Sequence, residues 1–317
     1  METCYSPQQY NLTSYGATIV AIISLEAFAG MWINAFIACV LCIGWVKKKI
    51  LNSNEKILLL LSCTRISHLF STGIYYFLAV IYPKYFYVQP ILQLLSFFTS
   101  FCNYSNLWVS ACLCAFYCIK IANFRNSFFI YLKVKIDRMV PWLLLGSGIS
   151  ALAMGIISYD LIETVQSNNL TFTCLGNIWE ESIRMDKHFF SALFLAGFGY
   201  AASFLAVIFS AVFLLFSLWR HKHKMQTNSM KDLSMEAHIR AMKSILSFLV
   251  MYSINFVCLI LTVIDAMKNE NAMTLLVSIY LCAFPGVHSL ILICSNPKLE
   301  KALLEILCCM KCTFSMK

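Results

Sequence analysis

The feature that most constrains this chain is a series of long stretches without charged side chains. A hydrocarbon core about 30 Å thick is crossed by roughly 20 consecutive apolar helical residues. Seven stretches reach that length, and one of them, 57–82, is interrupted by a single charged residue, Arg65. The other six contain no Lys, Arg, Asp or Glu, and they lie at 27–46, 85–119, 139–159, 189–219, 244–264 and 271–295.

The chain is therefore predicted to be an all-α membrane protein, a bundle of seven transmembrane helices. With their polar ends included, we expect these helices at about 15–46, 56–82, 88–122, 139–159, 188–220, 237–265 and 272–295. A short amphipathic tail helix is expected at 297–309, with Pro297 at its first position. The connections are short, so residues 1–317 are expected to form one domain.

Composition excludes several function classes. Hydrophobic residues make up 60% of the chain and charged residues 12%, and the mean hydropathy is +0.74. Soluble domains carry roughly 45–50% apolar and about 25% charged residues. A soluble enzyme, a disordered chain and a nucleic-acid binder are thereby excluded. The sequence also lacks a phosphate-binding loop, a dinucleotide fingerprint, a zinc-protease motif and a nucleophile elbow, so we expect no catalytic residues, no cofactor and no metal.

Basic residues predict the orientation of the bundle. Lys and Arg concentrate in the cytoplasmic connections of membrane proteins. The first apolar run is followed directly by Lys47, Lys48 and Lys49, which places its end in the cytoplasm. With seven crossings, 19 of the 24 basic residues then lie on the cytoplasmic side. The N-terminus is predicted outside and the C-terminus inside.

Three classes of seven-helix protein fit this topology: a G-protein-coupled receptor, a retinal protein, and a transporter or channel. A retinal protein needs a lysine in the seventh helix for the Schiff base, and 272–295 contains none. Transporters usually carry internal repeats, and the two halves of this chain show no similarity. The receptor is the favoured interpretation, and a seven-span transporter or channel is the alternative.

Polar residues inside the apolar runs need partners. An arginine near the bilayer centre costs about 2.5–3.5 kcal/mol by insertion scales, so Arg65 should face the bundle. Asn34 lies at a comparable depth, and its amide oxygen is expected to accept from the guanidinium. Glu26 lies about 12 Å above Asn34, too far for direct contact with Arg65. These residues are expected to join helices or to act as a switch.

The seventh helix carries two further residues of interest. Pro285 removes a backbone hydrogen bond and predicts a kink, which could serve as a hinge. His288 follows within one turn, and we interpret it as a core residue in preference to a metal ligand. His221 and His223 alternate with lysines, and residues two apart point to different helix faces, so they are not expected to bind metal either.

Modification sites can be placed on the predicted topology. Cys4 and Cys174 lie on the outer side, where a disulfide is one option that the spacing does not require. Asn169 in the second outer loop is the stronger candidate for glycosylation, and Asn11, closer to the membrane, is the weaker one. Three cysteines at or just beyond the end of the tail helix are candidates for palmitoylation, at Cys308, Cys309 and Cys312.

Three strings at the cytoplasmic ends of the helices resemble one family. Helix three ends in FYCIK (116–120), helix six opens with EAHIR (236–240), and helix seven contains HSLIL (288–292). The motifs of most receptors, a terminal Asp-Arg-Tyr triplet in helix three and Asn-Pro-x-x-Tyr in helix seven, are absent. With Arg65 in helix two, these strings resemble the type 2 taste receptors of vertebrates, the bitter receptors.

The resemblance implies a multi-pass plasma-membrane receptor for small, mostly neutral amphipathic bitter compounds. It implies coupling to a heterotrimeric G protein with a gustducin-like α-subunit, followed by phospholipase C signalling; a dimer is left open. Matched position by position, the candidate agonist-binding residues are Tyr76, Thr99, Ser100, Asn103, Asn255 and Ser278. The candidate residues facing the G protein are Tyr117, Lys120, His221, Arg240 and Lys243. Many mammalian members have Trp at the position of Thr99 and Pro at that of Ser203, so their ligands do not transfer.

Overall fold

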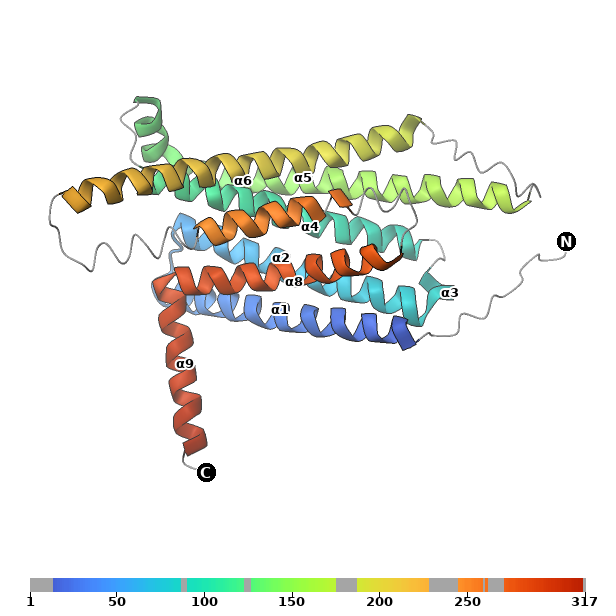
Figure 1. Ribbon diagram of the computed structural model, residues 1–317, viewed down its shortest axis with the longest axis horizontal. Coiled ribbons are helices and arrows are strands. Elements are labelled where there is room, and N and C mark those ends of the chain that lie inside the picture. The colour runs from blue at the N-terminus through green and yellow to red at the C-terminus, as the bar shows by residue number, and fades with distance from the viewer. Residues whose placement is uncertain are drawn as a thin grey trace.

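The computed structural model describes residues 14–86, 90–122, 127–174, 187–227, 245–258, 260–261 and 271–315 of the 317-residue chain. Every regular element in these ranges is a helix, which confirms the predicted fold class (Figure 1). The helices are α1 (Ser14–Lys48), α2 (Ser53–Ile81), α3 (Pro83–Phe86), α4 (Ile91–Ile121), α5 (Ser127–Cys174), α6 (Lys187–Thr227), α8 (Asn271–Ser295) and α9 (Pro297–Ser315). A shorter apolar helix, Ile245–Cys258, lies between α6 and α8 in the sequence.

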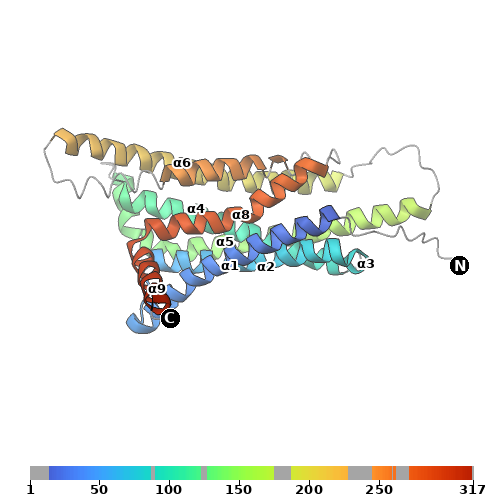
Figure 2. The ribbon, with the colours of Figure 1, turned by 60° about the horizontal axis from the view of Figure 1, so that its bottom comes forward.

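The long helices lie side by side as a bundle, and α9 leaves one end of it at a steep angle (Figures 1 and 2). Helix α4 occupies the middle, in contact with α2, α5 and α6, while α1 contacts α2 and α8. The first residues of α1 lie at the opposite end of the bundle from α9 (Figure 1). We refer to the two ends as the α9 end and the far end.

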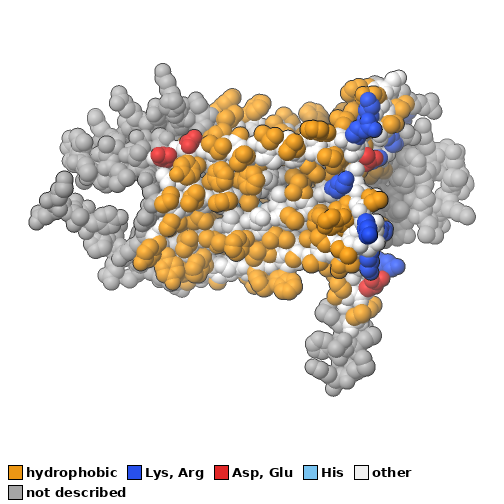
Figure 3. Space-filling view, turned by 180° about the vertical axis from the view of Figure 1, so that it is seen from behind, with side chains coloured by type: hydrophobic (Ala, Val, Ile, Leu, Met, Phe, Trp, Pro, Cys, Tyr) orange, Lys and Arg blue, Asp and Glu red, His pale blue; other side chains and the backbone are white. Residues whose placement is uncertain are grey.

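The surface of the bundle is that of a membrane protein. Six helices among the described residues are long and apolar enough to cross a bilayer, and the shorter apolar helix Ile245–Cys258 lies within the span expected at 237–265. Exposed hydrophobic side chains cover the middle of the bundle, while Lys and Arg gather at the α9 end (Figure 3). By the distribution of basic residues, the α9 end is the one predicted to face the cytoplasm.

Helix α5 is much longer than the expected helix at 139–159. It begins at Ser127, and its first turns carry Lys133, Lys135 and Asp137 while Ile136 packs into the core. Charged residues end a membrane span, but a helix continues past them where its backbone hydrogen bonds still form and one face is buried. The helix also continues to Cys174, so Asn169 lies on a helix and not in a loop as expected.

Helices α1 and α8 touch backbone to backbone. A Cβ on Gly286 of α8 would lie 3.2 Å from the Cα of Gly30 of α1, and a Cβ on Gly30 would lie 2.7 Å from the Leu69 side chain. Small residues permit this approach, as in other membrane helix pairs. Pro285 lies inside α8, and the helix changes direction along its length (Figure 2).

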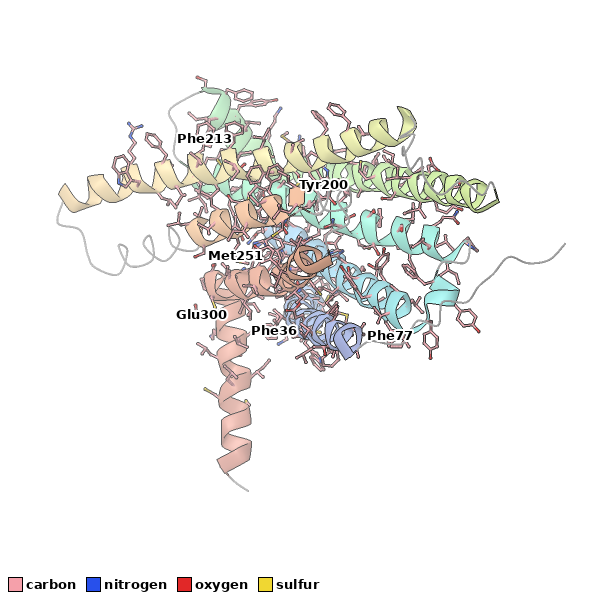
Figure 4. The ribbon with its side chains drawn as sticks, turned by 45° about the vertical axis from the view of Figure 1, so that its right-hand side comes forward. Phe36, Phe77, Tyr200, Phe213, Met251 and Glu300 are labelled. Carbon is pink, nitrogen blue, oxygen red and sulfur yellow. The ribbon has the colours of Figure 1, made fainter. Side chains whose placement is uncertain are left out.

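An ion pair connects α9 to the rest of the bundle. The Lys298 ammonium lies 2.5 Å from a carboxylate oxygen of Glu55, at the start of α2. A Cβ on Gly44 of α1 would lie 2.8 Å from the Lys298 nitrogen, so the absence of a side chain there makes room for the lysine. Figure 4 marks the junction by Glu300, in the first turn of α9.

We expect Lys298→Ala to destabilise the purified protein by roughly 0.5–1 kcal/mol, because partly exposed ion pairs contribute no more than that. Lys301→Ala is the matched control: its ion pair with Glu305 spans 4.0 Å and both side chains are exposed, so no measurable change is expected. Thermal unfolding in detergent reports both. Lys298→Glu and Glu55→Lys should each lower the midpoint of thermal unfolding, and the double variant that carries both should restore it. A double variant no more stable than the single variants would contradict the ion pair.

Candidate functional site

A buried arginine lies at the centre of the bundle. Arg65 has no exposed surface, and its guanidinium donates to side chains on two other helices. Its Nε donates to the Asn106 Oδ1 on α4 at 3.1 Å, and one Nη donates to the Ser289 Oγ on α8 at 2.7 Å. The other Nη donates to the Ser110 Oγ at 3.5 Å and contacts the His288 Nδ1. These contacts join α2 to α4 and α8.

The expected direct contact between Arg65 and Asn34 is wrong. Ser289 stands between them: its Oγ accepts from Arg65 and donates to the Asn34 Oδ1 at 2.7 Å. The Asn34 amide nitrogen donates to the carbonyl of Gly30, one turn earlier in α1. Asn34 is thus connected to Arg65 through α8 and not directly.

The partners of Arg65 that the described residues supply are all neutral. Glu26 is not among these partners, and one of its oxygens is buried without a hydrogen-bond partner among the described residues. A buried charge surrounded by neutral groups depends on those hydrogen bonds for its solvation. Asn106, Ser110 and Ser289 were not singled out from the sequence, because small polar residues are common in membrane helices and give no specific signal.

His288 is buried beside Arg65 and packs against three aromatic rings, those of Phe248, Tyr252 and Phe284. Its Nδ1 contacts Arg65, and its Nε2 has no hydrogen-bond partner among the described residues. Within the ranges that the structure describes, no group of His, Cys, Asp and Glu could hold a metal ion.

A cavity of about 310 Å³ opens beyond His288 toward the α9 end. Its wall is mostly apolar, and its polar members include Asn54 of α2, Tyr117 of α4 and His288. The Asn54 Oδ1 is buried and lacks a hydrogen-bond partner among the described residues. The lining comes from α2, α4, α6, Ile245–Cys258, α8 and the start of α9.

Of the five residues expected to face a G protein, Tyr117 lines this cavity. Lys120 instead pairs with Asp137 at the start of α5, at 2.5 Å. Arg240 and Lys243 lie outside the described residues, as does the side chain of His221, whose backbone belongs to α6.

The six candidate agonist-binding residues lie on the far side of Arg65 from this cavity. Along α4, Thr99, Ser100 and Asn103 precede Asn106, and along α8 Ser278 precedes Ser289 by three turns. The hydroxyl of Tyr76 hydrogen-bonds the side chain of Ser278, so the structure brings these two together across α2 and α8.

The remaining candidates do not contact one another in a single cluster. Asn103 donates from its amide nitrogen to the Tyr200 hydroxyl of α6 at 2.8 Å, and Ser100 contacts Ser158 of α5 at 2.6 Å. The Thr99 hydroxyl is buried and has no partner among the described residues, and Asn255 is buried.

Aromatic rings surround the Asn103–Tyr200 contact. The Tyr200 ring lies 4.5 Å from that of Tyr104, centroid to centroid, and Phe204 stacks on Phe256 at 4.0 Å. Figure 4 places Tyr200 on α6, beside the part of the bundle that contains α4. A polar pair beside apolar rings is the composition of a small-molecule site.

The candidate modification sites are placed only in part. Cys308 and Cys309 are exposed on α9, and the side chain of Cys312 lies outside the described residues. Asn11 and Cys4 also lie outside them, as do the side chains of Asn169 and Cys174 at the end of α5.

Comparison with known proteins gives one consistent result. The profile of the family described as taste receptor protein (TAS2R) matches residues 12–311. Taste receptor type 2 member 9 of Pongo pygmaeus is 30% identical over 299 residues, which cover 92% of this chain and 93% of that protein. Taste receptor type 2 member 9 of Homo sapiens is 30% identical over 304 residues (93% and 95%), and member 7 of Macaca mulatta is 29% identical over 308 residues (93% and 94%).

Proposed function

Because this chain belongs to the taste receptor type 2 family, and is therefore a multi-pass plasma-membrane receptor, we propose that it detects small amphipathic bitter compounds and signals through a gustducin-like G protein and phospholipase C. The observation that carries the proposal is the division of the bundle by Arg65: polar candidates with aromatic neighbours on one side, an apolar cavity on the other.

The chemistry of the candidate agonist-binding residues favours a mostly neutral ligand. Asn103, Asn255 and the nearby hydroxyls each donate and accept hydrogen bonds, and none carries a fixed charge. The aromatic rings of Tyr104, Tyr200 and Phe204 supply apolar surface beside them. Small-molecule sites combine a few placed polar groups with such walls.

We expect Asn103→Ala to raise the agonist concentration for half-maximal response about tenfold, because one hydrogen bond to a ligand is lost and the hydroxyl of Tyr200 loses its donor. Calcium release in cells that carry the variant at the wild-type surface density is the measurement. Ser147→Ala is the control, since the Ser147 hydroxyl donates to the backbone carbonyl of Leu144 in the same helix, α5. Equal potency for wild type and Asn103→Ala would remove Asn103 from the agonist site.

The cavity and the basic residues at the α9 end favour a G protein as the partner there. The cavity there is lined by five transmembrane helices and the start of α9, and Lys and Arg gather around that end (Figure 3). A basic rim favours association with an acidic, helical segment such as the C-terminal end of an α-subunit.

A screen of bitter compounds on cells expressing this chain tests the proposal. Agonists should release intracellular calcium only in cells that also supply a gustducin-like or chimeric α-subunit. A transporter or channel, the alternative function, would respond equally without the α-subunit, and that result would contradict the proposal.

A further inference from the structure

The first turns of α5, at the α9 end of the bundle (Figure 1), present one exposed face that combines aromatic and basic side chains. Tyr131 is 54% exposed and Trp142 is 73% exposed, and the two residues between them on this face, Lys135 and Arg138, are exposed as well. The four residues follow one another at intervals of four, three and four, which places them on one face of a helix. Ile136, in contrast, is buried in the core. The exposed face is therefore available to a partner outside the bundle.

This face continues along α5 into the part of the helix that crosses the bilayer. Leu145, Ile149 and Leu152 follow Trp142 at intervals of three and four residues, and all three are exposed. They belong to a candidate membrane span, Ser127–Glu163, so this face of the span contacts lipid. Lys and Arg side chains border the exposed apolar surface at the α9 end (Figure 3). The basic part of the face therefore lies where the lipid tails give way to the headgroups.

The distances along the helix agree with the thickness of the headgroup layer. With a rise of about 1.5 Å per residue, Arg138 lies about 6 Å and Lys135 about 10 Å from Trp142 toward the α9 end. Tryptophan is enriched where the hydrocarbon ends, and the headgroup layer beyond it is roughly 5–8 Å thick. With Trp142 at that boundary, Arg138 lies among the phosphates, and the flexible Lys135 side chain reaches them from the outer edge.

The two cations of this face are not neutralised within the described ranges. Lys135 donates from Nζ to the Tyr131 hydroxyl at 2.6 Å, and its ammonium lies 4.4 Å from the centre of that ring. Arg138 forms no ion pair with a described residue, whereas the adjacent Asp137 pairs with Lys120. Side chains three residues apart on a helix are neighbours, so the two positive charges repel. An anion bound between them removes that repulsion.

We infer that Lys135, Arg138 and Trp142 bind the headgroup of an anionic phospholipid in the inner leaflet, with Tyr131 holding Lys135 on the same face. The α9 end is the one predicted to face the cytoplasm, and anionic lipids concentrate in that leaflet. The guanidinium of Arg138 donates two parallel N–H bonds to phosphate oxygens, and Lys135 adds a second charge. The Trp142 ring packs against the glycerol backbone and the first acyl carbons.

The layout of the face favours a lipid over a protein partner. A soluble protein that approaches from the cytoplasm reaches Lys135 but not Trp142, which lies at the edge of the hydrocarbon. A second copy of the chain could reach both residues. In a symmetric dimer the face would meet itself, however, and the contact would bring four positive charges together.

A titration of the purified protein in neutral detergent with soluble dioctanoyl phosphatidylserine tests the inference, and native mass spectrometry gives the affinity for the first lipid bound. Dioctanoyl phosphatidylcholine, which has no net charge, should bind at least tenfold more weakly. We expect Arg138→Gln to weaken phosphatidylserine binding about fivefold, and the double variant with Lys135→Gln about 25-fold, since each basic residue contributes about that factor. Both side chains are exposed, so the thermal midpoint without lipid should stay unchanged.

Lys133→Gln is the matched control, because it removes the same charge from the same helix but on another face. The Lys133 ammonium donates to the carbonyl of Ala122, at the end of α4, at 3.4 Å. This variant should change lipid affinity less than about twofold. Equal weakening by Lys133→Gln and Arg138→Gln would mean attraction by net charge alone and would overturn the site. Unchanged lipid affinity in the double variant would overturn it too, and the simultaneous loss of a dimer would then assign the face to a second copy.

Discussion

Replacement of Arg65 by methionine should reduce the receptor at the cell surface more than any other single change in the bundle. Methionine fills part of the volume but leaves the acceptors of Asn106 and His288, and the hydroxyl of Ser289, without their donor. Each buried group that loses its hydrogen-bond partner costs about 1–3 kcal/mol. Removal of the buried charge offsets only part of that cost. We expect a net destabilisation of roughly 2–4 kcal/mol.

Thermal unfolding of the purified variants is the measurement. Arg65→Lys keeps the charge, but a single ammonium cannot reproduce the fork of donors, so it should be closer to methionine than to wild type. Ser62→Ala is the control on the same helix. Ser62 is buried, and its hydroxyl donates to the backbone carbonyl of Leu58 one turn earlier, so we expect a destabilisation of less than about 1 kcal/mol. A lysine variant as stable as wild type would mean that charge alone, and not the geometry of the contacts, holds the network.

Replacement of Gly286 by valine should separate α1 from α8. A Cβ at this position already lies 3.2 Å from the Cα of Gly30, and the neighbour is backbone that cannot rotate away. Overpacking of this kind costs about 1–3 kcal/mol. The crossing also lies one turn from the Ser289–Asn34 hydrogen bond, so that contact is lost with it and the total reaches the upper end of the range.

Gly148 of α5 supplies the matched control, because nothing lies within 4 Å of a Cβ placed there. Gly148→Val should leave the thermal midpoint unchanged or raise it slightly, since glycine weakens a helix interior by about 0.5–1 kcal/mol relative to alanine. Both variants are compared by thermal unfolding and by surface labelling. Equal tolerance of valine at the two positions would show that the close contact of α1 and α8 does not limit stability.

The fold was predictable because bilayer crossing depends on length and hydrophobicity alone. Six described helices meet that criterion where the apolar runs predict them. Helix ends were less predictable, since charged residues mark the end of the bilayer and not of the helix. Helix α5 illustrates this: Lys133 and Asp137 lie within it, and Ile136 between them is buried.

The sequence predicts that Arg65 lies among polar groups, but it does not predict which residues contact it. The cost of a buried charge implies that Arg65 faces polar groups, and the structure agrees. Which groups they are depends on the rotation of each helix about its axis, which no single sequence specifies. The Ser289 hydroxyl therefore occupies the position expected for Asn34, and the Tyr200 hydroxyl accepts a hydrogen bond from Asn103.

We expect that a compound bound on one side of Arg65 promotes nucleotide exchange by a G protein on the other. Its most direct measurement is binding of a non-hydrolysable GTP analogue by a purified gustducin heterotrimer, with the receptor in nanodiscs and an agonist found by the calcium screen. We expect agonist-dependent acceleration of exchange in the wild type and its loss in Arg65→Met. Exchange that stays at the basal rate with the agonist bound to the wild-type receptor would contradict it.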